Sequence, residues 1–197
     1  MSEPGDVTIA SYDATVDLYV AQTATPSPVV AAWLDHVADV IGPGHVLEVG
    51  SGPGHDALRL EEHGLRVSRT DATPGFVDRL RAAGHDARRL DLRSDDLGGP
   101  YDAMLADAVL LHLDRTQFAD VLARARRAVV DGGVLAFTIK EGDGDEWHER
   151  KLGVPRHFTY WREPAVRAAL ENTGWQVVEL EHVSGFEPWL YVIARTA

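Results

Sequence analysis

The sequence predicts an α/β fold: a seven-stranded, mostly parallel sheet with an antiparallel last strand and helices on both faces. Short apolar runs alternate with helix-patterned stretches over residues 45–139, an order typical of a parallel sheet covered by helices. Residues 50–54 hold three glycines between the first apolar run and a helical pattern, which indicates a tight strand-to-helix turn. Two further apolar runs, 175–182 and 189–194, lie so close in the chain that they should pair as an antiparallel hairpin.

The N-terminal arm and helix occupy residues 1–41, within which residues 13–21 could form a short helix and 27–41 carry a helical apolar stripe. A later helix over 116–130 should be N-capped near Asp114 and ended by the glycines of 131–133. The other expected helices begin at residue 56 and cover 75–83 and 164–173, and the expected strands cover 45–49, 65–70, 87–90, 101–106, 134–139, 175–182 and 189–194.

Length and composition are those of one globular domain over residues 1–197, with 45% hydrophobic and 25% charged residues. The absence of cysteine excludes disulfides and Cys-type zinc sites. The acidic N-terminus is unlike a signal peptide and no apolar run is long enough to span a bilayer, so we expect a cytoplasmic protein with no membrane partner. A net charge of −12 argues against a nucleic-acid partner.

Acidic residues lie in or just after the first four predicted strands. Glu48 is inside the first, while Asp71, Asp91 and Asp107 close the second, third and fourth. In an open parallel sheet, ligands bind beyond the carboxyl ends of the strands, where the strand order reverses. The glycine spacing G-x-G-x-G is tighter than the G-x-G-x-x-G of dinucleotide sites. We therefore expect a ligand site at this edge, of a different kind from a pyrophosphate site.

The pattern E-x-G-x-G-x-G with a downstream acid resembles motif I of the class I S-adenosylmethionine (SAM)-dependent methyltransferases. The mostly parallel sheet with one reversed strand is also similar to that family, and the resemblance covers about residues 13–195. It implies a Rossmann-like fold, SAM as cofactor and S-adenosylhomocysteine (SAH) as product. It also implies methyl transfer to an oxygen or nitrogen atom of a small molecule or short peptide, by a monomer or homodimer.

The same resemblance suggests which residues hold the cofactor. The loop backbone would bind the methionine part, and Glu48 would orient its amine. Asp71 would accept the ribose hydroxyls, and Asp91 with Leu92 would contact the adenine. The other residues expected on the cofactor side are Tyr19, Gly50, Ser51, Gly52, Gly54, Ala72, Ala106 and Asp107.

The acceptor side should include the aromatic-rich insertion 140–162, because long loops inside compact domains are often functional lids. Within it, His148, His157 and Tyr160 are candidates to meet the acceptor. His112, in the segment LLHLD, is either a general base or a polar residue that flanks a helix. No metal is expected, since His148-Glu149 lacks the second histidine of an H-E-x-x-H zinc motif.

Two alternatives stay open at this point. An NAD(P)-dependent oxidoreductase would need a pyrophosphate near Glu48, whose charge would repel it if it faced the site. A catalytically inactive SAM-binding regulatory protein is compatible with the sequence, because methyl transfer by displacement needs no signature nucleophile.

Overall fold

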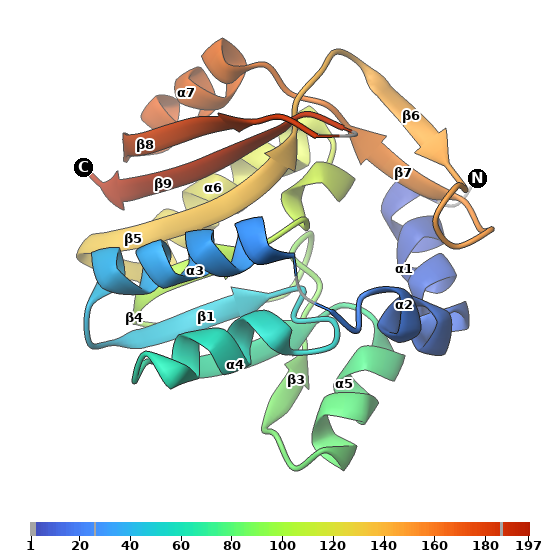
Figure 1. Cartoon of the computed structure of the whole chain (residues 1–197). Coiled ribbons are helices and arrows are strands. Elements are labelled where there is room, and N and C mark those ends of the chain that lie inside the picture. Colours follow the sequence, from blue (N-terminus) through green and yellow to red (C-terminus); the bar gives the residue numbers. More distant parts are fainter. Residues whose placement is uncertain (1–2, 26, 186) are drawn as a thin grey trace.

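The computed structural model describes residues 3–25, 27–185 and 187–197, which form a seven-stranded sheet and a separate two-stranded hairpin (Figure 1). The sheet strands are β1 (His45–Val49), β2 (Arg66–Asp71), β3 (Ala87–Arg89), β4 (Tyr101–Ala106), β5 (Val129–Lys140), β8 (Trp175–Val183) and β9 (Trp189–Thr196). Their order is β3-β2-β1-β4-β5-β9-β8, and β9 is antiparallel to both neighbours while β1 to β5 pair in parallel. The predicted sheet and its reversed strand are confirmed. Phe186, in the expected β8–β9 connection, lies outside the described residues.

Helices connect the parallel strands and cover the sheet. Proline occupies the first turn in four of them, where its missing N–H costs nothing because that group has no intrahelical partner. The helices are α1 (Pro4–Ala14), α2 (Val16–Gln22), α3 (Pro28–Ile41), α4 (His55–Glu62), α5 (Pro74–Ala82), α6 (Arg115–Ala128) and α7 (Glu163–Asn172), with a 3-10 turn, η1, at Leu110–His112.

The two faces of the sheet carry two separate cores. Val46 of β1 packs in one cluster with α3 residues such as Val37, and that cluster extends to α4. The next residue, Leu47, points the opposite way and packs with Phe118 of α6 in a cluster that reaches α7. Because both faces are covered, the central strands are apolar without alternation, as buried parallel strands are.

The strand order reverses between β1 and β4. From β1 the chain continues to β2 and β3 on one side, then returns to β4 on the other. Helices α1 and α2 lie beyond the carboxyl ends of these strands, together with the hairpin of β6 (Asp145–His148) and β7 (Arg156–Thr159) (Figure 1). The hairpin forms most of the predicted 140–162 insertion, which was expected as a loop. This arrangement encloses the edge where a ligand is expected.

The N-terminal arm differs from the sequence-based expectation. The predicted helix over 13–21 is wrong in its bounds, because α1 starts at Pro4 and Thr15 separates it from α2. The side chains that α1 buries are the polar Thr8 and Ser11, so no apolar stripe marks the helix. Ser11 donates to the carbonyl of Pro155 at 2.6 Å, and Thr8 Oγ1 accepts the N–H of His157 at 3.0 Å. Hydrogen bonds rather than a hydrophobic face thus bind α1 to the hairpin.

The junction of α6 and β5 also differs. The helix begins at Arg115 with Asp114 as its N-cap, as predicted, but ends at Ala128 rather than at the following glycines. Those glycines lie inside β5, which starts at Val129. A Cβ on Gly133 would lie 2.7 Å from the carbonyl oxygen of Asp102 and 2.9 Å from that of Val130, so glycine is needed for close backbone approach and not for a helix stop. Among the described residues, no helix is long and apolar enough to cross a membrane.

Candidate active site

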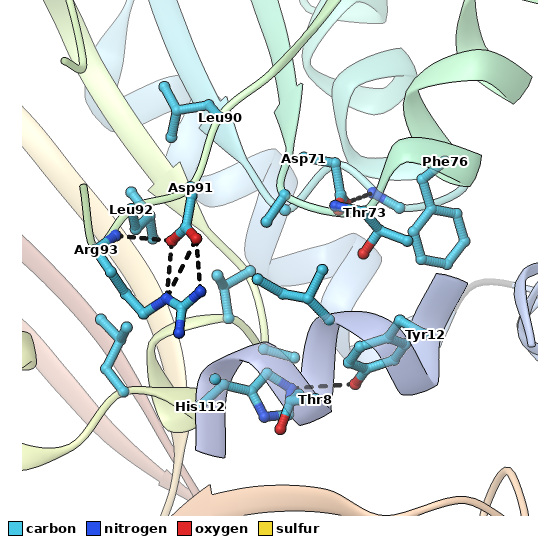
Figure 2. A pocket seen from close by; sticks show the side chains of 18 of the residues that line it. Thr8, Tyr12, Asp71, Thr73, Phe76, Leu90, Asp91, Leu92, Arg93 and His112 are labelled. Atoms are coloured by element: carbon cyan, nitrogen blue, oxygen red, sulfur yellow. Dashed lines mark hydrogen bonds and ion pairs between the residues drawn. The ribbon is translucent and has the colours of Figure 1, made fainter. Parts of the chain in front are cut away.

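A pocket of about 790 Å³, partly open to solvent, lies beyond the carboxyl ends of β1, β2 and β4 (Figure 2). Helix α1 contributes residues from Gly5 to Tyr12, and α5 contributes Phe76. Of the residues predicted for the site, nine line this pocket: Tyr19, Gly50, Gly52, Asp71, Ala72, Asp91, Leu92, Asp107 and His112. We call it the cofactor-side pocket.

The glycine loop after β1 forms one wall. Gly50 has a φ of +67°, and a Cβ there would lie 2.3 Å from Cγ2 of Val109, so only glycine fits. The N–H of Ser51 donates to the carbonyl of Thr70 at 2.9 Å, and the N–H of Gly52 donates to Oδ2 of Asp71 at 2.9 Å. The loop is therefore held to the end of β2.

Asp71 joins this loop to the start of α5. Its Oδ1 accepts the N–H of Thr73 at 2.8 Å (Figure 2) while Oδ2 accepts the N–H of Gly52, and the side chain is buried. Burial raises the pKa of Asp71, and these hydrogen bonds oppose that rise. A carboxylate offers about four lone-pair positions. Two remain for hydroxyl donors on a ligand in the pocket.

Asp91 holds an arginine that the sequence-based reading did not single out. Arg93 Nη2 lies 2.7 Å from Asp91 Oδ2 (Figure 2). It also lies 2.7 Å from Asp6 Oδ1 on α1, so Arg93 joins the segment after β3 to the N-terminal helix. Burial raises the pKa of Asp91, but hydrogen bonds from Arg93 outweigh it and hold the pKa below its ordinary value. The predicted adenine contact of Asp91 thus has Arg93 as a competing partner, while Leu92 lines the pocket beside it.

Three carboxyl groups that form no ion pair with the described residues gather under the glycine loop. Glu48 is 2% exposed and accepts a short hydrogen bond from Ser51 Oγ, while its Oε1 has no partner among the described residues. Burial raises the pKa of Glu48 to about 7. Burial and the charges of Asp107 and Glu48 also raise the pKa of Asp56, and burial raises that of Asp107. This region would be stabilised by a positive charge.

His112 lies where the loop after β4 meets α1. Its Nε2 is 3.1 Å from the hydroxyl of Tyr12 (Figure 2), and its Nδ1 is 2.7 Å from the carbonyl of His157. A carbonyl can only accept, so Nδ1 carries the proton and Nε2 accepts from Tyr12. Burial lowers the pKa of His112 to about 4, so the ring is neutral at pH 7. Tyr12 is a site residue that sequence reasoning missed, although its seven-residue spacing from Tyr19 was a signal.

A second pocket, of about 910 Å³ and also partly open, adjoins the first on the hairpin side. The two pockets share Tyr12, Tyr19, Ala108 and His112. We call this one the acceptor-side pocket.

The comparisons with known proteins bear directly on this arrangement. A family model described as a methyltransferase domain matches residues 47–135, which run from β1 into β5 and include the glycine loop, Asp71, Asp91 and Asp107. Residues 47–135 therefore form a methyltransferase domain of the class I SAM-dependent type.

Relatives of this methyltransferase differ in size and acceptor. Malonyl-[acyl-carrier protein] O-methyltransferase of Geobacter sulfurreducens is 29% identical over 73% of this chain, which spans 60% of that relative's length. The tRNA 5-carboxymethoxyuridine methyltransferase of Escherichia coli is 26% identical over 80% of the chain and 70% of its own length. A DhpI–SAH complex shares the fold, with a TM-score of 0.80, 22% identity, and coverage of 98% of this chain and 97% of its own.

Four residues predicted for the cofactor side of the methyltransferase do not line its pocket. Glu48 and Ser51 are buried behind the glycine loop, where they bond to each other. Gly54 begins α4 and donates its N–H to the carbonyl of Ser51 at 2.8 Å, and Ala106 is buried within β4. Their surroundings indicate that they shape the loop from behind.

The residues predicted for the acceptor side separate in the same way. His112 lines both pockets of the methyltransferase, and His148 lines the acceptor-side one. His157 lies 2.9 Å from Asp145, and Tyr160 donates to Glu146 at 2.5 Å. Neither His157 nor Tyr160 is among the residues that line the two pockets.

Proposed function

We propose that this methyltransferase transfers the methyl group of SAM to an oxygen or nitrogen atom of a small molecule or short peptide. The observation that carries the proposal is the junction of the two pockets at Tyr12, Tyr19, Ala108 and His112. With SAM in one pocket and the acceptor in the other, the methyl group would be transferred across this junction.

The charges around the cofactor-side pocket support SAM over a dinucleotide. The ammonium of its methionine part would be attracted to Asp107, which lines the pocket, whereas a pyrophosphate would add negative charge beside that carboxyl group. The free lone pairs of Asp71 suit the two ribose hydroxyls. The adenine would lie against Leu90 and Leu92, which are buried and apolar.

The reaction we propose is an in-line displacement. A lone pair of the acceptor atom forms the new bond to the methyl carbon as the carbon–sulfur bond of SAM breaks. The electron pair of the broken bond stays on sulfur, which becomes the neutral thioether of SAH. Bringing the two reactants into line and excluding water supply the acceleration. If the acceptor is a neutral hydroxyl or amine, its proton must leave, and Nε2 of the neutral His112, a residue that lines both pockets, is the candidate to accept it.

The lining of the acceptor-side pocket supports a small acceptor. Residues of α1, α2 and the hairpin line it, and the net charge of −12 disfavours a polyanionic partner. One relative is named for a tRNA nucleoside, so tRNA belongs in the test.

The proposal is tested by measuring SAH release from SAM with a panel of small hydroxyl, amine and carboxylate compounds, short peptides and unmodified tRNA. Asp71→Asn serves as the variant expected to lose turnover. Turnover with a small compound and none with tRNA supports the proposal. Turnover confined to tRNA would contradict the small acceptor, and SAM binding without any turnover would favour the inactive regulatory alternative.

A further inference from the structure

The acceptor-side pocket concentrates positive charge in a protein whose overall charge is strongly negative. Among the described residues that line it, four are cationic, Lys140, Arg150, Lys151 and Arg156, and one is a carboxylate, Glu187. Lys140 Nζ lies 2.5 Å from Glu187 Oε2, so that pair is neutralised. The other three have no carboxylate within ion-pair distance in the described part of the chain.

Arg156 is the most unusual of these cations. It lies in β7 with only 5% of its surface exposed, and its Nε is buried without a hydrogen-bond partner among the described residues. Its Nη1 donates to the hydroxyl of Tyr12 at 3.1 Å. Arg69 is equally buried and its Nε also lacks a partner, but its charge is paired, because both of its terminal nitrogens donate to Glu61 at 2.7–2.8 Å. A buried guanidinium without a carboxylate is costly.

Aromatic contacts do not compensate for that cost. The guanidinium of Arg156 lies 5.4 Å from the ring centre of Tyr12 and 5.1 Å from that of Phe158. Cation–π contacts contribute about 0.5–2 kcal/mol each, whereas burying an ion costs several kcal/mol. They also leave the Nε donor unsatisfied. Packing between aromatic rings therefore does not explain why an arginine occupies this position.

Lys151 adds to the positive potential on the open side of the pocket. Its Nζ lies 4.6 Å from the ring centre of Tyr19, at the junction of the two pockets. Burial and the neighbouring charges of Arg156 and Lys140 lower the pKa of Lys151. Arg150 is exposed beside it. Like charges crowded in this way repel one another until an anion lies between them.

We propose that the methyl acceptor carries an anionic group, a carboxylate or a phosphonate or phosphate, which binds Arg156 inside the acceptor-side pocket and Lys151 at its opening. The inference rests on the proposed function, since it identifies the class of acceptor for the same reaction. A guanidinium binds such oxyanions by paired, charge-assisted hydrogen bonds. Nη2 of Arg156 makes no hydrogen bond within the described residues and is not among the fully buried unpaired atoms, so it can supply one of the donors that this binding needs.

The test measures binding of matched probes by calorimetry with SAH at saturation. Phenylacetate is compared with phenylacetamide, and phenylphosphonate with the neutral phenylphosphonic diamide, so that each pair differs chiefly in charge. We expect each anion to bind at least about tenfold more tightly than its neutral counterpart, with the preference reduced at high ionic strength. The two pairs separate a carboxylate site from a phosphonate site.

Variants locate the binding. Arg156→Gln and Lys151→Gln should each weaken the preferred anion about tenfold, while Arg127→Gln, an exposed arginine of α6 outside both pockets, should leave it unchanged. If Arg156→Gln fails to fold, the double variant Lys151→Gln/Arg150→Gln tests the anion site instead, because both residues are exposed and their replacement should not disturb the fold.

The experiment distinguishes failure of the proposed function from failure of the anion site. If SAH does not bind the unmodified protein, the proposed function is wrong. If SAH binds but charged and neutral probes bind equally, or if Arg127→Gln weakens the anion as much as Lys151→Gln does, the anion site alone is overturned.

Discussion

The hydroxyl of Tyr12 lies 3.1 Å from Nε2 of His112, although the two residues are 100 positions apart in the chain. This hydrogen bond joins α1 to the loop after β4 at the place where the two pockets meet. It also occupies the one nitrogen of His112 that can accept a proton. An acceptor that uses Nε2 must therefore displace the Tyr12 hydroxyl.

We predict that the His112 ring stays neutral, with the proton on Nδ1, down to a titration midpoint of about 4, because burial disfavours the imidazolium. Nitrogen-15 NMR of the histidine rings measures both the tautomer and the midpoint. The exposed His182, whose pKa is raised by hydrogen bonds to Glu163 and Glu141, is the internal comparison. Tyr12→Phe should raise the His112 midpoint, since it removes a donor to the neutral form. A midpoint near 6.5 in the unmodified protein would contradict the geometry.

Asp71→Asn should weaken SAH binding by about tenfold or more, on the order of 1.4 kcal/mol, because one carboxylate oxygen is replaced by a donor. Asp86→Asn changes an exposed aspartate outside both pockets and should bind SAH normally. Calorimetry gives the affinities, and circular dichroism shows whether the loop change has disturbed the fold. Equal affinity in the two variants would remove Asp71 from the cofactor site.

Glu48 makes a pH-dependent contribution to stability. Its pKa is raised from 4.5 to about 7 in the folded protein, so between these values the folded state keeps a proton that the unfolded state has released. The contribution of protonated Glu48 to the stability of the folded protein is complete below pH 4.5 and is lost as the pH rises through 7. We expect Glu48→Gln to gain stability relative to the unmodified protein from pH 5 to pH 8, by on the order of 1–3 kcal/mol.

Urea unfolding at several pH values measures this difference. Glu62→Gln, at an exposed position of α4, should show no such change. A difference that is constant with pH would show that Glu48 is ionised in the folded protein throughout this range.

The N-cap of α6 gives a prediction that does not depend on the ligand. Asp114 accepts the N–H groups of Thr116 and Gln117, both at 2.8 Å, and the Gln117 side chain accepts the N–H of Asp114 in return. Asp114→Ala should lower the free energy of unfolding by about 1 kcal/mol. Asp120→Ala, on the exposed side of the same helix, should cost less, since its pair with Arg124 is 3.7 Å long. Equal losses would argue against the capping interaction.

Local signals made most of the fold predictable. The glycine loop after β1, the Asp114 cap and the close pairing of β8 and β9 each depend on residues near one another in the sequence. Helix α1 was missed because its partners are distant: Thr8 bonds to His157 of β7, 149 residues away, and Ser11 bonds to Pro155 just before β7, 144 residues away. Buried polar side chains leave no apolar periodicity from which a helix can be read.

The site residues at the strand ends could be predicted from the sequence, whereas those that depend on α1 folding over these ends could not. Asp71, Asp91 and Asp107 line the cofactor-side pocket because parallel strands end at one edge. Arg93 and Tyr12 were missed because their roles arise only when α1 folds over that edge. The direction of a side chain at a strand end also cannot be read from spacing alone, and Glu48 lies behind the loop rather than in the pocket.

The most direct test of the central claim is a calorimetric titration of the free protein with SAH and, separately, with NAD at the same concentration. The account predicts one SAH site per chain, competition between SAH and SAM for it, and no binding of NAD. Binding of NAD without binding of SAH would contradict it.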